Sequence, residues 1–268
     1  MIRKGYSDVP FGQVHWRIQD PETTSSRPDL YCLHPAPFSG LAFTTIMPHL
    51  AGDRRVIAPD FPGHGGSDAF KPNPSIEEFA EAMLAVADDL AGEEPFDLMG
   101  FHTGSLVAVE MALCATTQIR KLALVDVPAF DAADREQYKA ATAKPFGITP
   151  DLDCLEQPWD RGMTKRLDSH GPDRSFEMFV EQLRHGRNMN AAFHAGFSYD
   201  VEDKLPMVRQ PALVLASQSA LLDASRRAAK LMPSARLLER LDIKRAVLDE
   251  AAQRTAQELI SFFDEADT

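Results

Sequence analysis

The chain of 268 residues contains little cysteine and no long apolar segment. Its cysteines, Cys32, Cys114 and Cys154, form no C-x-x-C pair, and Cys32 and Cys114 fall in a predicted strand and helix, as small buried side chains do. No segment approaches about 18 uncharged apolar residues, and residues 1–8 have no apolar core of signal-peptide length. These absences predict a reduced, cytoplasmic protein that neither spans a membrane nor carries an export signal.

Positive charge is also scarce. The formal net charge of −12 argues against nucleic acid or an anionic membrane surface as a partner. The histidines show no His-x-x-x-His spacing, and no carboxylate cluster accompanies them, so we expect no metal and no other cofactor. The hydrophobic content of 44% suffices for one sizeable core. We therefore expect a small-molecule substrate or ligand, and the oligomeric state stays open.

One segment carries most of the functional information. Residues 98–105 read Leu-Met-Gly-Phe-His-Thr-Gly-Ser, which is the spacing of a nucleophile elbow, Gly-x-Ser-x-Gly, with His102 in place of the serine. Residues 94–99 predict a short buried strand, and residues 106–113 predict a packed helix. The motif thus has the strand, turn and helix that an elbow requires, although the same letters also fit an ordinary glycine-rich turn.

The two glycines of this motif favour the elbow. Gly100 and Gly104 stand two residues before and after the tip, where a Cβ would strike the backbone of so sharp a turn. The tip itself is usually strained, with φ above zero, and histidine tolerates that region comparatively well. We expect the elbow geometry to persist although the serine nucleophile is absent.

Two further loops support this interpretation. Residues 34–40, His-Pro-Ala-Pro-Phe-Ser-Gly, follow an apolar strand at 30–33, and residues 55–68 contain Ala-Pro-Asp-Phe-Pro-Gly-His-Gly-Gly-Ser-Asp. With these loops and the elbow, the chain resembles the α/β-hydrolase superfamily from about residue 12 to the C-terminus. Members carry a His-Gly loop after the third strand and an Ala-Pro-Asp-x-Pro-Gly-x-Gly-x-Ser-Asp loop after the fourth. The resemblance implies an α/β-hydrolase fold, with a mostly parallel central sheet flanked by helices and a helical cap.

Alternating apolar runs and amphipathic stretches agree with such a fold. We expect residues 1–128 and 206–268 to form the core, and residues 129–205, which hold no obvious strand and many Met and Phe residues, to form the cap. Strands are predicted at 13–18, 30–33, 94–99, 121–126, 211–217 and 235–239, and helices at 41–50, 75–90, 106–113, 223–231 and 248–263. An apolar cap favours a small hydrophobic or aromatic ligand.

The rest of a Ser-His-Asp triad is missing. In the superfamily the acid usually follows the strand predicted here at 211–217, but no carboxylate appears before Asp223. The base usually follows the last strand, but residues 240–247 hold no histidine, and none occurs after His194. Serine is a weak nucleophile without a partner that takes its proton, so this chain is not an ordinary serine esterase.

His102 is the leading catalytic candidate. At the N-terminus of a helix the imidazole is expected to be neutral, and a neutral ring can act as general base or attack a carbonyl directly. Asp126, at the end of the strand 121–126, is the candidate to orient it, and His34 could face it across the pocket. The resemblance implies an oxyanion hole from the amides of Thr103 and Ala36, although Pro35 stands where the loop usually has glycine. Further candidates for substrate contact are Phe38, Ser39 and Phe101.

Two interpretations remain open. The first is an enzyme of altered mechanism that acts on a small, largely apolar ester or carbonyl substrate, by hydrolysis or by lyase- or isomerase-type proton transfer. The second is a catalytically inactive protein of this fold that binds an apolar small molecule. In the cap, His170, His185 and His194 are further candidates to reach the pocket.

Overall fold

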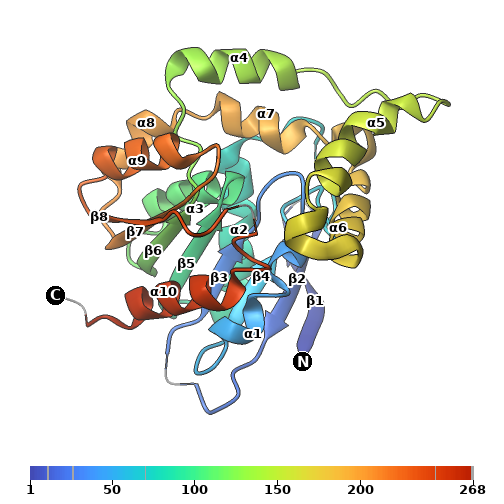
Figure 1. The fold of residues 1–268 in the computed structure, drawn as a ribbon. Coiled ribbons are helices and arrows are strands. Elements are labelled where there is room, and N and C mark those ends of the chain that lie inside the picture. Colours follow the sequence, from blue (N-terminus) through green and yellow to red (C-terminus); the bar gives the residue numbers. More distant parts are fainter. Residues whose placement is uncertain (11, 26, 70, 245, 267–268) are drawn as a thin grey trace.

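The computed structural model describes residues 1–10, 12–25, 27–69, 71–244 and 246–266, which build a twisted sheet covered by helices on both faces (Figure 1). The sheet order is β1-β2-β4-β3-β5-β6-β7-β8. Pairs β1–β2 and β2–β4 are antiparallel, and the other neighbouring pairs are parallel. The strands are β1 Ile2–Val9, β2 Gly12–Gln19, β3 Leu30–Leu33, β4 Val56–Pro59, β5 Phe96–Phe101, β6 Ile119–Val125, β7 Ala212–Ser217 and β8 Ala235–Arg240.

The central strands are buried on both faces, and their side chains alternate between two cores. In β3, Tyr31 and Leu33 pack with helices α2 (Ile76–Ala91), α3 (Thr103–Cys114) and α9 (Leu222–Leu231). Leu30 and Cys32 point to the other face, toward α1 (Met47–Leu50) and α10 (Ala252–Asp264). This period of two explains why the central strands read as continuous apolar runs.

The predicted fold class is confirmed, with three local differences. The strand β1 was not predicted because it is an edge strand with mostly exposed or half-buried residues, so it lacks an apolar pattern. The predicted helix at 41–50 is wrong: a 3-10 turn η1, Gly40–Phe43, and the short α1 replace it. Pro48 has no amide hydrogen to continue a helix from Thr44. The last helix begins at Ala252, four residues later than predicted.

Helices and turns fill the described chain between β6 and β7, without a strand. Figure 1 shows α4 and α7 above the sheet, with α5 and α6 beside them. The division of the chain into a core and a cap at 129–205 stays a prediction. The elements are α4 Ala132–Thr142, α5 Asp153–Trp159, the π-helical turn η2 Asp160–Thr164, α6 Leu167–Leu183, η3 Gly186–Asn188, α7 Ala191–Ser198, α8 Val201–Lys204 and η4 Leu205–Met207.

Polar contacts hold these helices to the sheet domain. The Tyr199 hydroxyl donates to a Glu110 carboxylate oxygen at 2.7 Å, and the ring Nδ1 of His185 lies 2.8 Å from the Gly63 carbonyl oxygen. Arg174 Nε donates to Asp249 Oδ1 at 2.9 Å. Within the described ranges, no helix combines the length and apolar character needed to cross a membrane.

Candidate active site

His102 stands at the tip of an elbow between β5 and α3. Its φ is 51°, a left-handed value that few side chains adopt, as the motif predicted. The glycines are required sterically: a Cβ on Gly100 would lie 2.4 Å from the Gly104 carbonyl oxygen, and a Cβ on Gly104 would lie 2.0 Å from that of Leu33. The His102 amide donates to the Val125 carbonyl at 3.0 Å, which ties the tip to β6.

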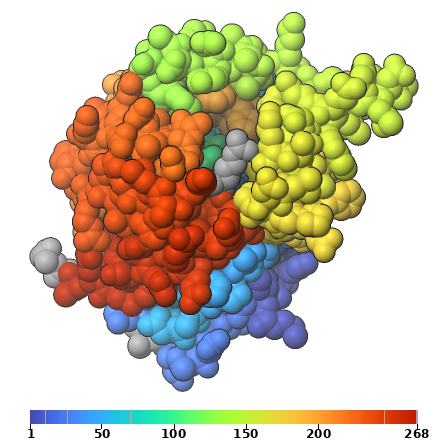
Figure 2. All heavy atoms as spheres, in the orientation of Figure 1, coloured from blue at the N-terminus to red at the C-terminus, as the bar shows by residue number. Residues whose placement is uncertain are grey.

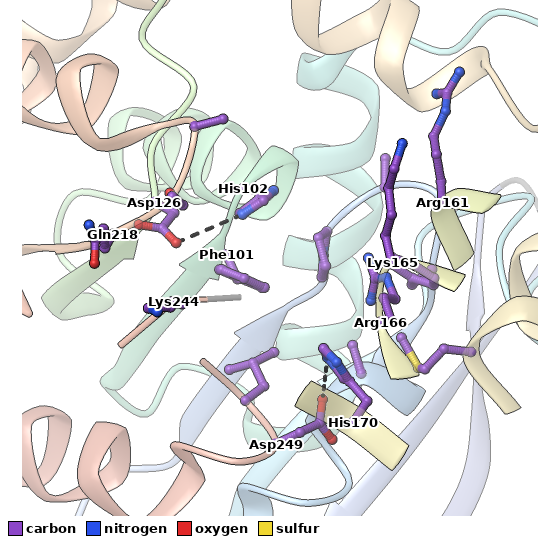
Figure 3. A pocket seen from close by; sticks show the side chains of 18 residues that line it. Phe101, His102, Asp126, Arg161, Lys165, Arg166, His170, Gln218, Lys244 and Asp249 are labelled. Atoms are coloured by element: carbon purple, nitrogen blue, oxygen red, sulfur yellow. Dashed lines mark ion pairs between the residues drawn. The ribbon is translucent and has the colours of Figure 1, made fainter. Parts of the chain in front are cut away.

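Asp126 lies beside His102 at the end of the neighbouring strand. Its φ is 48°, and its Oδ2 is 3.9 Å from His102 Nε2 (Figure 3). The Ser217 amide donates to Asp126 Oδ1 at 2.8 Å, and the Ser217 hydroxyl donates to Oδ2 at 2.6 Å. The end of β7 thus fixes a buried carboxylate against the imidazole, at a separation longer than a hydrogen bond.

The pocket keeps the His102 ring neutral. Burial lowers the pKa of His102 to about 4, because the Asp126 carboxylate raises it less than burial and the Arg166 cation lower it. The ring still has an open edge, since 39% of the side chain is exposed to solvent. In the neutral tautomer with Nε2–H toward Asp126, Nδ1 carries the lone pair and can accept a proton.

The N-terminus of α3 lies next to the tip, where the oxyanion donor Thr103 is expected. Thr103 is the first residue of α3, and the first amides of a helix have no partner within it. Ala36, the second expected donor, lines the same cavity, in the loop after β3. The helix N-terminus and this loop therefore frame the space above His102, as in an oxyanion hole.

A cavity of about 480 Å³ opens over the elbow. Figure 2 shows the molecular surface hollowed between the orange-red C-terminal part and the yellow surface of α6. Phe38 and Phe101, the candidates for substrate contact, line this cavity, and the Phe101 ring centroid lies 4.2 Å from that of His102. A second cavity of about 260 Å³ also reaches His102 and Thr103, and its other walls are mainly apolar, including Leu106, Phe130, Phe193, Phe197 and Leu221.

Two predicted site residues lie elsewhere. His34 is fully buried and does not line the cavity: Nε2 accepts the Phe61 amide at 2.9 Å, and Nδ1 lies 3.1 Å from the Pro35 carbonyl. Both ring nitrogens are engaged, so His34 serves the loop and the prediction that it faces His102 is corrected. Ser39 is also buried; its hydroxyl donates to Glu181 of α6 and accepts the Leu41 amide, which removes it from substrate contact.

The structure adds residues that the sequence reasoning did not place in the site. Arg161, Lys165 and Arg166 line the cavity from the segment η2–α6, opposite His102 (Figure 3). Arg161 and Lys165 are four residues apart, a spacing that puts two side chains on the same face of a helix. The spacing alone does not show that this face is turned toward the cavity. Of the three histidines named as candidates to reach the pocket, His170 lines the cavity, with Nε2 3.4 Å from Asp249 Oδ2, whereas His185 and His194 line neither cavity. Burial lowers the pKa of His170.

The loops after β7 and β8, where the superfamily usually holds its acid and base, bring other polar groups to the cavity. Gln218, just after β7, and Lys244, after β8, both line it. Arg245, in the same stretch as Lys244, lies outside the described residues. Across the described part of the chain, no group of three or more His, Cys, Asp or Glu side chains is arranged to hold a metal ion.

The chain matches the alpha/beta hydrolase family model over residues 30–258, and it belongs to this family. A solved structure with the same fold is the enol-lactonase from Burkholderia xenovorans LB400, with a TM-score of 0.82 and 20% identity, covering 97% of this chain and 100% of that chain. The hydrolase from Pseudomonas aeruginosa PA01 is similar, with a TM-score of 0.80, 20% identity and 98% of both chains covered. At 20% identity, the similarity to these two structures shows a shared fold.

A curated relative also resembles the chain in sequence. It is the pimeloyl-[acyl-carrier protein] methyl ester esterase of Aromatoleum aromaticum, which is 30% identical over 124 residues, 46% of this chain and 46% of that protein. The chain thus spans about half the length of this relative.

Proposed function

We propose that the chain hydrolyses a small carboxylic ester, thioester or lactone, with His102 as the base that activates water. The observation that carries this proposal is the elbow: a strained backbone holds a neutral imidazole in a cavity, beside a buried carboxylate and the N-terminus of α3. The esterase and enol-lactonase activities in the names of similar proteins support the same reaction class.

The proposed reaction needs no triad. Nδ1 of His102 takes a proton from a water molecule while the water oxygen attacks the carbonyl carbon. The resulting oxyanion accepts the Thr103 amide, and Asp126 stabilises the imidazolium that forms. The imidazolium then returns the proton to the leaving oxygen or sulfur as its bond to carbon breaks. In the proposed geometry the apolar part of the substrate occupies the second cavity.

Turnover of a panel of short and aromatic 4-nitrophenyl esters and thioesters tests the proposal. We expect His102→Ala to lower kcat/KM by about a hundredfold or more with a nearly unchanged melting temperature, because general-base catalysis contributes roughly that factor. His102→Ser is expected to be equally inactive, since the described residues that line the cavity include no carboxylate from the loop after β7 and no histidine from the loop after β8. His49→Ala, at an exposed position of α1, is the control.

The pH dependence of the turnover rate tests whether His102 is the base. The base works when neutral, so the rate should rise through a pKa of about 4 and stay level to pH 8. A rate that is the same in wild type and His102→Ala would overturn the proposal. Direct attack by the imidazole, the other role considered for His102, would leave an acyl-protein that mass spectrometry detects after rapid quenching.

A second candidate function is ligand binding without turnover. The absence of a histidine after His194 favours it, because a serine-type proton relay then lacks its usual base. Failure of all esters and thioesters in the panel, together with retained binding of an ester analogue, would support this candidate. Exchange of a proton next to a carbonyl, followed by NMR in D₂O, tests for lyase- or isomerase-type chemistry.

A further inference from the structure

The wall opposite His102 carries positive charge. In η2 the Lys165 amide donates to the Asp160 carbonyl at 3.0 Å, a bond across five residues that widens the turn. This turn presents Arg161, Lys165 and Arg166 to the cavity together, and Figure 3 shows all three across the cavity from His102. π-helical turns of this kind occur frequently at functional sites. We call these three residues the cationic wall.

Arg166 is the best-positioned member of the cationic wall. Its guanidinium carbon lies 4.9 Å from the centroid of the Phe38 ring, a cation–π contact with another residue of the cavity wall. Its charge contributes to the lowered pKa of both His102 and His170, which line the cavity on either side of it. The Arg166 cation therefore acts on the interior of the site.

The carboxylates of the cavity are already engaged by other groups. Asp126 accepts two hydrogen bonds from Ser217. Asp249 accepts Arg174 Nε at 2.9 Å and the Thr45 hydroxyl at 2.8 Å. Lys165 Nζ lies 2.6 Å from Asp160 Oδ2, a carboxylate outside the cavity lining. Lys244 adds a further cation, so among the described lining residues Arg161, Arg166 and Lys244 add positive charge to a cavity that contains the carboxylates of Asp126 and Asp249.

The sign of this charge is opposite to that of the whole chain, whose formal net charge is −12. A local positive field on an acidic protein attracts anions to one place and repels them elsewhere. The second cavity, by contrast, is mainly apolar and, at about 260 Å³, larger than the roughly 150 Å³ apolar cavity that admits a benzene ring. Because His102 lines both cavities, the two environments meet at the proposed reacting group.

We propose that the substrate is an anionic ester or thioester, with a carboxylate bound along the cationic wall and an apolar group in the second cavity, so that the scissile carbonyl lies between them at His102. A carboxylate fits the two-pronged donor geometry of arginine. The placement of the carbonyl rests on the proposed hydrolytic function, whereas binding of the carboxylate does not. The expected substrate is therefore amphipathic, not largely apolar.

Calorimetric binding tests the carboxylate site without any turnover. The probes are 6-phenylhexanoate and 6-phenylhexanamide, which differ in the charge of one end. We expect the acid to bind wild type at least about tenfold more tightly, as charge-assisted hydrogen bonds allow. Arg166→Gln should remove most of that preference, Arg166→Lys should restore part of it, and Arg187→Gln, an exposed cation that lines neither cavity, should retain it.

Several outcomes would overturn the carboxylate site. Equal binding of acid and amide to wild type is one, and an unchanged preference in Arg166→Gln is another. If the melting temperature shows that Arg166→Gln does not fold, Arg161→Gln is measured instead, since the exposed position of Arg161 makes that variant safe for folding. In that variant we expect a reduced preference for the acid, and an unchanged one would count against the cationic wall.

Turnover of matched esters separates this inference from the proposed function. The pair is 4-nitrophenyl hydrogen adipate and 4-nitrophenyl methyl adipate, and we expect the anionic ester to have the lower KM by about tenfold. Preference for the acid in binding without turnover of either ester would keep the carboxylate site and refute hydrolysis. Turnover that depends on His102 but shows no preference would keep hydrolysis and refute the carboxylate site.

Discussion

Acid should destabilise the fold through a cluster of three buried histidines, His34, His64 and His185. The ring centroids of His34 and His64 lie 5.4 Å apart, and those of His64 and His185 lie 4.4 Å apart. None of the three is more than 8% exposed. Burial lowers the pKa of each, to about 4 for His34; His185 opposes protonation of His34 and His64, while Asp60 acts in the opposite direction.

The sign and size of the change in unfolding free energy follow from the difference in proton binding between the folded and the unfolded chain. Unfolded histidine has a pKa of about 6.5, so between pH 6.5 and 4 the unfolded chain binds more protons than the folded one. The stabilisation is therefore complete above pH 6.5 and is lost as the pH falls toward 4. At pH 4.5, His34 alone would remove about 2 to 3 kcal/mol, a large part of a typical stability of about 5 to 15 kcal/mol.

Urea unfolding at a series of pH values between 7 and 4.5 measures this loss. His34→Gln should be less stable at pH 7, because two hydrogen bonds of the ring are lost, yet its free energy of unfolding should fall less steeply with acid. His49 lies on the exposed surface, so the unfolding free energy of His49→Gln should fall with acid as steeply as that of wild type. This control includes the part of the fall that comes from protonation of carboxylates. Parallel pH profiles for wild type and His34→Gln would refute the argument.

Further predictions concern the elbow and its carboxylate. Gly104→Ala should lower the free energy of unfolding in urea by about 3 kcal/mol or prevent folding, because the Cβ would lie 2.0 Å from the Leu33 carbonyl oxygen. Gly52→Ala, with no atom within 4 Å of the new Cβ, is its control, and equal losses would contradict the steric argument. Asp126→Asn should lower kcat/KM by about tenfold or more and move the rate midpoint below pH 4, because the carboxylate raises the His102 pKa. Ser217→Ala should have a smaller effect, since the backbone amide still donates to Asp126 at 2.8 Å; an unchanged rate in Asp126→Asn would exclude the proposed partner.

The sequence predicts the parts of the site that the backbone determines. In so sharp a turn only glycine fits at the two positions that flank His102, so the residue pattern reveals the elbow. The apolar runs of β5 and β6 place the elbow and Asp126 on neighbouring strands. These are local or nearest-neighbour properties, so a residue pattern is sufficient to show them.

The parts that were missed depend on contacts between distant segments. His34 is excluded from the cavity because the Phe61 amide, far along the chain, donates to its ring. Arg161 and Arg166 enter the site because the segment η2–α6 docks over the sheet in one rotation, and their charges would fit equally well on a solvated face. An edge strand such as β1 carries no pattern because packing hardly constrains it.

The register of the sheet has a consequence for how this site could change. Phe101 pairs with Val125, so His102 and Asp126 are the next residues on two adjacent strands, and both leave the sheet with positive φ. A shift of one residue in either strand would turn these side chains to the opposite face. Substitution can therefore exchange the chemical groups at these two positions, while insertion or deletion cannot relocate them. The backbone thus conserves a place for chemistry independently of which side chains perform it.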